Sequence, residues 1–212
     1  ALTHGHEVWW AKVFPFSLLM RWIGDSVDHL TYLGEYTKRE ISKGISAKAR
    51  AAMVQIAPGI DTEKFKPIDA TDLRSSLGLK EKEVIISVGR LVPRKGQDKL
   101  IEALPSILKT RPKAHLLFVG SGSFQSKLEQ IIKKLDMQSH VTFVGRVQYE
   151  ELAKYICVGD IFAMPSRSRL AGLEVEGLGI VYLEASACGL PVLGGDSGGA
   201  PDAVLPLSLI HI

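Results

Sequence analysis

The sequence predicts an α/β fold built on parallel sheets, and three observations lead to that prediction. From Glu83 onward, short apolar runs alternate with stretches in which apolar residues recur at helical spacing. The runs are apolar throughout, as in strands that are buried on both faces of a sheet. Glycine-rich loops follow these runs, and in such sheets ligands bind beyond the carboxyl ends of the strands.

The elements after Glu83 follow in a regular order. Residues 83–89 (EVIISVG) are a β-rich run ending in glycine, and residues 98–109 predict a helix with Leu100, Ile101 and Leu104 on one face. Pro105 is unfavourable inside that helix because it lacks a backbone N–H. Strands are then expected at 114–120, 141–145, 160–165 and 191–195, and helices at 123–137, 149–156 and 180–189.

The first part of the chain predicts the end of another α/β unit. A loop (THGHE) precedes a helix at 17–27, a strand at 28–34, a helix at 35–43 and a strand at 53–57. The segment PGIDTEKFKP is polar and rich in turn residues, which is typical of a hinge. We therefore expect residues 1–57 to be the C-terminal part of an N-terminal Rossmann-like domain, 58–67 a hinge, and 68–204 a second Rossmann-like domain facing it across a cleft.

Both ends of the chain are unusual. It begins without Met and without the charged and apolar regions of a signal peptide. The final LSLIHI resembles a translated transposon end from a sequencing library, so residues 205–212 are expected to be a non-native tail. We interpret the chain as a fragment that is open at both ends and inactive by itself.

The composition is that of an ordinary globular protein. Of 212 residues, 46% are hydrophobic and 23% are charged, which allows a sizeable core. The net charge of +3, with basic and acidic residues mixed along the chain, weakly favours an anionic ligand and gives no indication of nucleic-acid binding. Cys157 and Cys188 form no CxxC motif and have no histidine at ligand spacing. We therefore expect no disulfide framework, no metal site and a reducing, cytoplasmic compartment.

Basic, glycine-rich loops follow the predicted strands. Their cations and some of their glycines are Arg90, Arg94, Lys95, Arg146, Arg167, Gly89, Gly120 and Gly145. Cations and backbone N–H groups bind phosphate, and glycines allow a ligand to approach the backbone closely. This rim predicts a nucleotide site. A nicotinamide cofactor is disfavoured, because Gln125 stands where the third glycine of a G-x-G-x-x-G motif belongs.

Two glutamates, Glu176 and Glu184, lie in an apolar stretch with no charge between them. A buried carboxylate is costly unless it is paired or accepts hydrogen bonds, so each of them requires a partner. The alternative is a pair of solvated surface glutamates, which the glycines around Glu176 and the apolar residues between the two disfavour. On a continuous helix the two side chains would lie about 80° apart, whereas a loop beneath Glu176 lets them converge on one ligand.

The motifs THGHE, PGIDTEKFKP, SVGRLVPRKG, VGSG, FVGRV, PSRSR and EGLGIVYLEASACGLPV together resemble the retaining GT-B glycosyltransferases of family 4, which carry an E-x7-E signature. The resemblance covers about residues 1–204, and the motifs occur in the order of the family. The wording of THGHEV, GLEVEGLGIVYLEA and SGGAPD is most similar to the actinobacterial enzymes that mannosylate phosphatidylinositol monomannoside from GDP-mannose.

The resemblance implies a role for each candidate residue. Glu176 would contact hydroxyls of the transferred hexose, and Glu184 would bind the two ribose hydroxyls, as a carboxylate can. Arg90 and Lys95 match the diphosphate clamp, and His4, or less favourably His6, matches the histidine that approaches the sugar. The remaining donor-binding candidates would contact the donor through backbone N–H groups or let it approach the backbone closely. Those near the nucleotide are Gly89, Gly120, Gly145, Arg146 and Val147, and those near the sugar and phosphate are Gly177, Leu178, Gly179 and Ile180.

The expected activity is metal-independent transfer of a hexose, as implied by the resemblance, from a nucleotide-sugar such as GDP-mannose to a lipid-linked inositol acceptor. No cofactor other than the nucleotide-sugar donor is expected. The aromatic stretch from Trp9 to Trp22, with Lys12 and Arg21, would line a lipid groove or touch the inner face of the cytoplasmic membrane, or else belong to the core. Two alternatives remain: a family 4 transferase with a UDP-sugar and a soluble acceptor, and a non-catalytic nucleotide-binding module.

Overall fold

The structure, a computed structural model, describes residues 1–3, 5 and 7–204. The chain divides into two compact units, which are described separately. The larger one, which we call the sheet unit, consists of Ile60–Pro165 and Val181–Gly195. The other, which we call the helical unit, consists of Ala1–Gly59, Ser166–Ile180 and the described residues from Asp196 onward. The predicted domain boundaries remain a prediction.

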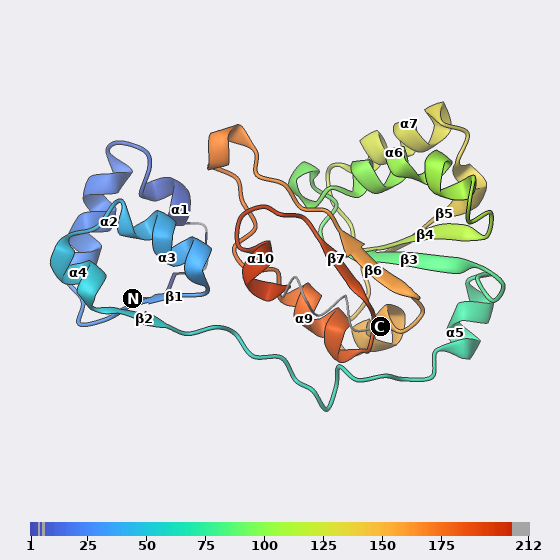
Figure 1. The fold of residues 1–212 in the computed structure, drawn as a ribbon, viewed down its shortest axis with the longest axis horizontal. Coiled ribbons are helices and arrows are strands. Elements are labelled where there is room, and N and C mark those ends of the chain that lie inside the picture. The colour runs from blue at the N-terminus through green and yellow to red at the C-terminus, as the bar shows by residue number, and fades with distance from the viewer. Residues whose placement is uncertain (4, 6, 205–212) are drawn as a thin grey trace. The chain divides into compact units, whose positions relative to one another are not determined.

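The sheet unit is built on five parallel strands in the order β5-β4-β3-β6-β7 (Figure 1). Their bounds are Glu83–Val88 for β3, Ala114–Val119 for β4, Val141–Gly145 for β5, Ile161–Met164 for β6 and Val192–Gly194 for β7. All residues of β4 are buried, which explains why this run contains no polar alternation. The parallel sheet predicted from the apolar runs is confirmed.

Helices cover both faces of this sheet. In Figure 1, α6 (Gln97–Leu108) and α7 (Gln125–Lys134) lie over one face and α9 (Ile180–Ala187) lies on the other. The unit also contains α5 (Thr71–Ser76), α8 (Leu152–Ile156) and two short 3-10 helices, η1 (Pro93–Lys95) and η2 (Gln138–His140). The helix α6 runs through Pro105, because Leu100, Ile101 and Leu104 bury its apolar face against the sheet and offset the lost N–H.

The core of the sheet unit has one layer on each side of the strands. Between the sheet and α6 and α7 lie buried apolar side chains that include Leu91, Leu116, Phe118, Leu128 and Ile132. On the other side, the ring of Tyr182 on α9 meets that of Phe162 edge to face, with 5.8 Å between centroids. The Tyr182 hydroxyl donates to the Met164 carbonyl at 2.8 Å, so this fully buried tyrosine keeps a partner for its polar atom.

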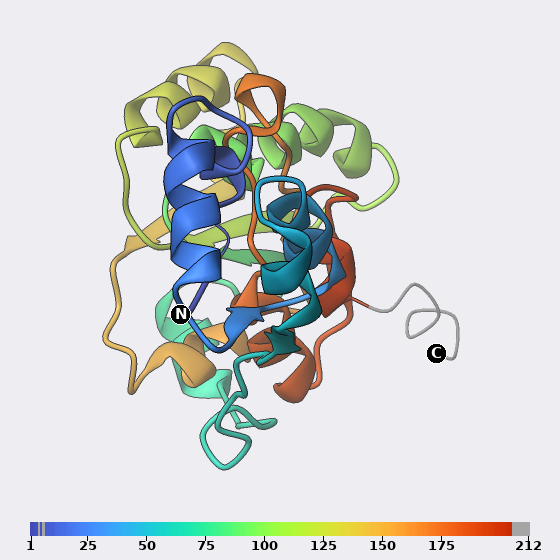
Figure 2. The same ribbon diagram turned by 90° about the vertical axis from the view of Figure 1, so that its left-hand side faces the viewer.

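The helical unit contains a short parallel pair, β1 (Leu30–Tyr32) with β2 (Met53–Gln55). Its helices are α1 (Glu7–Trp10), α2 (Phe16–Asp25), α3 (Glu35–Ser42), α4 (Ala47–Ala51) and α10 (Ala200–Ala203), with the 3-10 turn η3 (Leu170–Gly172). Figure 2 looks onto this unit and shows α2, α3 and α4 grouped around the strand pair. Val8, Met20, Leu30 and Ile41 are buried among these elements.

Candidate functional site

A pocket opens at the carboxyl edge of the sheet, where ligands of parallel sheets bind. It has a volume of about 460 Å³ and follows the ends of β3, β4 and β5. Its lining consists of Val88, Gly89, Arg90, Val119, Gly120, Ser121, Arg146, Val147 and Leu152. Five of these residues, Gly89, Arg90, Gly120, Arg146 and Val147, are candidates from the sequence, so the fold brings together positions that are far apart in the chain.

Three glycines lie side by side at this edge, and the backbone is packed too closely for a side chain at Gly120. Gly89 N donates to Val119 O at 2.9 Å, and Gly120 N donates to Gly145 O at 2.7 Å, so the three glycines stand in a row. Gly120 has a φ of +133°, and a Cβ there would collide with the carbonyl oxygen of Gly89. The row therefore leaves the pocket floor to backbone groups, which suits a phosphate or a base edge.

Both candidate cations of the diphosphate clamp lie on the loop between β3 and α6. Arg90 lines the pocket, and the buried Lys95 has its Nζ 4.0 Å from the place that a Gly89 Cβ would occupy. Gln97, fully buried at the start of α6, donates from Nε2 to the Arg90 carbonyl at 3.3 Å. A buried amide thus fixes the backbone beneath Arg90, a contact that sequence reasoning missed, since a glutamine carries no distinctive signal.

Glu184 lies on α9 in the sheet unit and is 8% exposed. Burial raises the pKa of its carboxyl group, and the charge of Lys64 opposes that rise. Lys64 Nζ lies 3.4 Å from the ring centroid of Tyr149, and the buried Phe65 contacts the same ring at 5.8 Å. The predicted hinge therefore places a cation beside Glu184. The only sequence signal for this contact was a single aromatic residue, Phe65, in a polar segment.

Glu176 lies in the helical unit, in the irregular segment before α9, and is 9% exposed. The loop expected beneath it is present. Its carbonyl oxygen accepts from Gly199 N at 2.8 Å, and a Cβ on Gly199 would collide with the carbonyl of Gly177. A Cβ on Gly5 would come within 2.7 Å of Gly177 Cα, so glycines pack against the EGLG segment from two sides.

The segment before Glu176 forms a closed turn. Arg169 and Glu174 are paired through their backbones and by an ion pair of 3.0 Å, and Leu170, Ala171 and Gly172 between them all have positive φ. Lys12 holds this turn, since its Nζ donates to Gly172 O at 3.2 Å and pairs with the buried Glu40 at 3.1 Å. Sequence reasoning assigned Lys12 to the aromatic stretch and missed this contact.

The candidates thus fall into two groups. The pocket-lining candidates belong to the sheet unit, as do Lys95, Gly145 and Glu184, which are not among the residues that line the pocket. The helical unit contains Glu176, Gly177, Leu178, Gly179 and Ile180. Leu178 is buried and Gly179 has a φ of +81° just before α9 begins at Ile180. His4, His6 and the tail 205–212 lie outside the described residues. The roles of all these residues remain predictions.

The described residues contain neither a metal-binding cluster nor a helix that could cross a membrane. Over residues 1–3, 5 and 7–204, no group of three or more His, Cys, Asp and Glu side chains is arranged to hold a metal ion. In the same part of the chain, none of the helices combines the length and the apolar character needed to cross a bilayer. Cys157 and Cys188 are free thiols.

Comparisons with known proteins identify relatives of this chain. The family model described as glycosyl transferases group 1 matches residues 69–208. A Corynebacterium glutamicum protein, GDP-mannose-dependent monoacylated alpha-(1-6)-phosphatidylinositol monomannoside mannosyltransferase, is 44% identical over 97% of this chain and 54% of its own length. The GDP-mannose-dependent alpha-(1-6)-phosphatidylinositol monomannoside mannosyltransferase of Mycolicibacterium smegmatis is also 44% identical, with coverages of 97% and 54%. The chain therefore spans about half the length of the curated relatives it matches.

Solved structures resemble the chain as well. Anabaena HepE in complex with UDP-glucose superposes with a TM-score of 0.80 at 23% identity, covering 96% of this chain and 55% of that one. Sucrose-phosphate synthase from Thermosynechococcus elongatus gives a TM-score of 0.78 at 25% identity, with coverages of 97% and 52%. The predicted GT-B fold is confirmed.

Proposed function

Because this chain belongs to the glycosyl transferases group 1 family, we propose that it is part of a retaining hexosyltransferase that moves mannose from GDP-mannose to a phosphatidylinositol-mannoside lipid. One observation carries the proposal. Five candidate donor-binding residues, Gly89, Arg90, Gly120, Arg146 and Val147, line a single pocket at the ligand-binding edge of the sheet. The pocket combines close backbone with two guanidinium groups, which is the chemistry that a nucleoside diphosphate requires.

The names of the relatives support the proposed donor and acceptor. The two actinobacterial proteins that are 44% identical over 97% of this chain are both named for GDP-mannose and for phosphatidylinositol monomannoside. We extend these substrates to the present protein. Backbone contacts from Arg146 and Val147 would hold the base, and Glu184 would accept hydrogen bonds from the two ribose hydroxyls.

The chemistry uses charge stabilisation. As the bond between mannose and phosphate breaks, negative charge grows on the departing GDP, and Arg90 and Lys95 stabilise that charge more than they stabilise the intact donor. The acceptor hydroxyl attacks from the face that the phosphate leaves, and its proton passes to the departing phosphate oxygen. Glu176 would bind hydroxyls of the hexose and so orient the reacting carbon.

The helical unit offers a surface for the lipid acceptor. Phe14, Leu18 and Trp22 are 77%, 58% and 67% exposed, and the exposed Arg21 lies among them. Apolar side chains with a neighbouring cation suit the boundary between acyl chains and anionic headgroups. We propose that this surface of α2 and the preceding loop rests on the inner face of the cytoplasmic membrane, where the acceptor lipid is found.

The test is mannosyl transfer by the full-length protein. Labelled GDP-mannose is supplied with vesicles that contain phosphatidylinositol monomannoside, and we expect a labelled lipid with one more mannose and retained anomeric configuration. UDP-glucose and UDP-mannose serve as rival donors. Transfer from a UDP-sugar alone would replace the donor, whereas GDP binding without any transfer would leave a nucleotide-binding module. Vesicles that do not bind the protein would reject the membrane surface.

A further inference from the structure

Asp202 makes a contact within the helical unit that bridges two distant stretches of sequence. It lies on the short helix α10, and its Oδ2 accepts a hydrogen bond from the backbone N of Tyr36 at 2.9 Å. Tyr36 is in the first turn of α3, whose free N–H groups and positive dipole end favour a carboxylate. Asp202 therefore caps a helix that lies 166 positions away in the chain.

The start of α3 is shaped to receive this carboxylate. Its N-cap residue is Gly34, which has no side chain to accept from the first turn. Thr37 Oγ1 instead accepts from the backbone N of Gly34 at 3.1 Å and of Leu33 at 3.2 Å, and leaves the N–H of Tyr36 to Asp202. A Cβ on Gly34 would lie 2.9 Å from Asp202 Cβ, so any larger residue would displace the cap.

A short path leads from this cap to Glu176. Asp202 N donates to Gly199 O at 3.1 Å, and Gly199 N donates to the carbonyl of Glu176 at 2.8 Å. Gly198 and Gly199 lie so close to the backbone of Glu176 and Gly177 that a Cβ on either glycine would collide with it. The position of α10 therefore sets the position of the Glu176 backbone.

We propose that Asp202 is a positioning residue that holds Glu176 in place for catalysis by anchoring α10 to the first turn of α3. The inference rests on the proposed function, in which Glu176 binds the transferred hexose. Asp202 acts through Glu176 and not on the substrate itself. Without its carboxylate, α10 loses its anchor on α3, and the hydrogen bond from Gly199 no longer fixes the Glu176 segment.

The expected effect is on turnover and not on nucleotide affinity. A displacement of about 1 Å at a reacting centre costs up to roughly a hundredfold in rate. The residues proposed to hold the base, the ribose and the diphosphate through their side chains or the pocket backbone, among them Arg90, Arg146 and Glu184, belong to the sheet unit. The affinity for GDP should therefore remain within about twofold of wild type. A general loss of folding would lower both quantities together.

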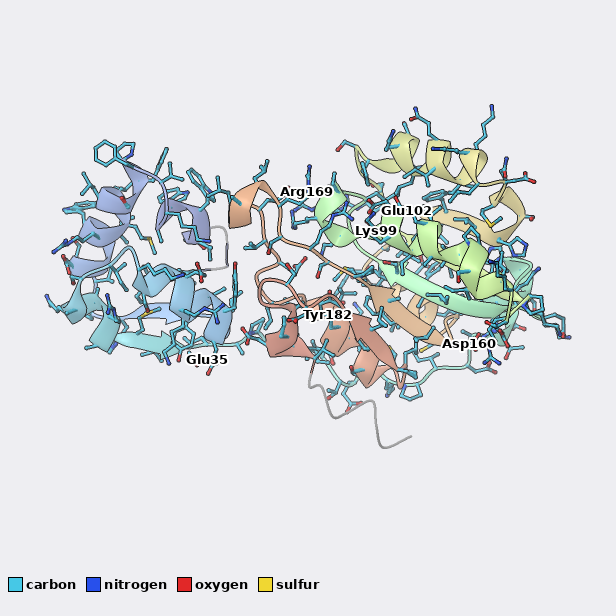
Figure 3. The ribbon with its side chains drawn as sticks, turned by 45° about the horizontal axis from the view of Figure 1, so that its top comes forward. Glu35, Lys99, Glu102, Asp160, Arg169 and Tyr182 are labelled. Atoms are coloured by element: carbon cyan, nitrogen blue, oxygen red, sulfur yellow. The ribbon has the colours of Figure 1, made fainter. Side chains whose placement is uncertain are left out.

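The experiment compares three variants of the full-length protein. Asp202→Ala removes the cap, and Asp202→Asn keeps an oxygen that accepts from Tyr36 N. Glu35→Ala is the matched control, because Glu35 is a 69% exposed carboxylate in the same first turn of α3, paired only with Lys38 among the described residues (Figure 3). The measurements are kcat, KM for GDP-mannose, the Kd of GDP and hydrogen exchange of the Tyr36 amide.

We expect Asp202→Ala to lower kcat by about ten- to a hundredfold with GDP affinity unchanged and faster exchange at Tyr36. Asp202→Asn should recover most of the loss, and Glu35→Ala should behave as wild type. A wild-type kcat in Asp202→Ala would overturn the inference, as would GDP affinity that falls in parallel with kcat, or unaltered exchange at Tyr36. If the wild-type protein transfers no mannose, the proposed function fails, while exchange at Tyr36 still tests the anchor.

Discussion

Arg74 and Asp160 form a bidentate ion pair at the amino end of the sheet, in which the Nη1–Oδ1 distance is 2.9 Å and the Nη2–Oδ2 distance is 2.7 Å. Arg74 also donates to the carbonyls of Leu79 and Val158, and Asp160 accepts from the backbone N of Val84 at 2.7 Å. The pair therefore ties α5 to β3 and to the start of β6. In Figure 3, Asp160 lies at the opposite end of the sheet from Tyr182.

Asp160→Asn should destabilise the sheet unit without altering nucleotide binding. Burial would raise the pKa of Asp160, but the Arg74 guanidinium and the Val84 N–H outweigh it and leave the pKa below its ordinary value. Since the side chain is 49% exposed, we expect a loss of only about 1 to 2 kcal/mol in unfolding free energy. Urea unfolding measures it, with Glu81→Gln, which is 78% exposed, as the control. Equal stability of the Asp160 and Glu81 variants would contradict this role.

Acidification should destabilise the protein through His115. This side chain is 5% exposed, its Nε2 lies 2.8 Å from Thr142 Oγ1, and its Nδ1 has no hydrogen-bond partner among the described residues. Burial, helped by the charges of Lys82 and His140, lowers its pKa to about 4. The unfolded chain binds the proton near pH 6.5 and the folded chain only near pH 4, so stability is complete above pH 6.5 and falls between these values.

The free energy of unfolding should fall by roughly 3 kcal/mol by pH 4, as expected for a histidine whose pKa is lowered from 6.5 to about 4. Urea unfolding at pH 7.5, 6, 5 and 4 measures this loss in wild type and in His115→Gln, which keeps a polar contact with Thr142 but does not titrate. The variant should lose much less stability over this range. Parallel pH profiles for the two proteins would show that another group is responsible.

Replacing Arg90 or Lys95, the two cations of the proposed diphosphate clamp, should lower the turnover number more than it lowers the affinity for the intact donor. Arg90→Ala and Lys95→Ala each remove charge that matters most as GDP departs. We expect the activation free energy to rise by about 3 to 4 kcal/mol, which lowers turnover roughly a hundred- to a thousandfold. Saturation kinetics of the full-length protein measure this. Lys99→Ala is the control, because Lys99 lies on the outer side of α6 and pairs with Glu102 at 2.6 Å (Figure 3).

An unchanged turnover number in both clamp variants would remove the catalytic role of these cations. The same assay with added chelator examines the metal-independent mechanism. Activity abolished by chelator and restored by a divalent cation would replace charge stabilisation by Arg90 and Lys95 with stabilisation by a metal.

The two glutamates of the signature should separate in their effects. Glu184→Gln replaces one of the two oxygens that accept from the ribose hydroxyls with an NH2 donor and removes the negative charge, so it should weaken GDP binding. Glu176→Gln should mainly lower the single-turnover rate at saturating donor. Calorimetric titration with GDP and rapid-quench kinetics give the two quantities. Burial raises the pKa of Glu184, so its carboxylate becomes protonated at a higher pH than that of an exposed glutamate. The affinity of the wild-type protein for GDP should therefore fall as the pH drops through this raised pKa. Equal losses of affinity and rate in both variants would reject the division of roles.

Much of the sheet unit was predictable because its signals are local. Apolar runs such as AHLLFV predict buried strands, and the glycines that follow them indicate the edge where a ligand binds. Gly89, Gly120 and Arg146, which were candidates on this basis, line the pocket. The helix α6 was expected in spite of Pro105, because its apolar spacing is strong. By contrast, α5 contains no buried residue and was not predicted, because helical periodicity of apolar residues is visible only in helices that have an apolar face.

The contacts that anchor the candidate residues were not predictable. Asp202 caps α3 across 166 positions, Lys12 reaches Gly172 across 160, and Lys64 approaches Glu184 from a segment that reads as a polar hinge. Each of these side chains is a single charged residue with no motif around it that indicates its partner. Their partners are backbone atoms or single carboxylates, which leave no periodic pattern in the sequence.

The glycine row at the pocket edge has a consequence for how variation among relatives should be interpreted. At Gly120 every side chain is excluded by the carbonyl of Gly89, a neighbour within the same fold. At Gly145 none of the described residues comes within 4 Å of the position that a Cβ would take, and only the backbone strain at a φ of +82° disfavours a side chain, a strain that asparagine and aspartate tolerate better than other residues. Invariance at Gly120 would therefore record the approach of two backbones, even in a lineage that had lost its ligand, whereas replacement of Gly145 by asparagine or aspartate is the change to expect in such a lineage.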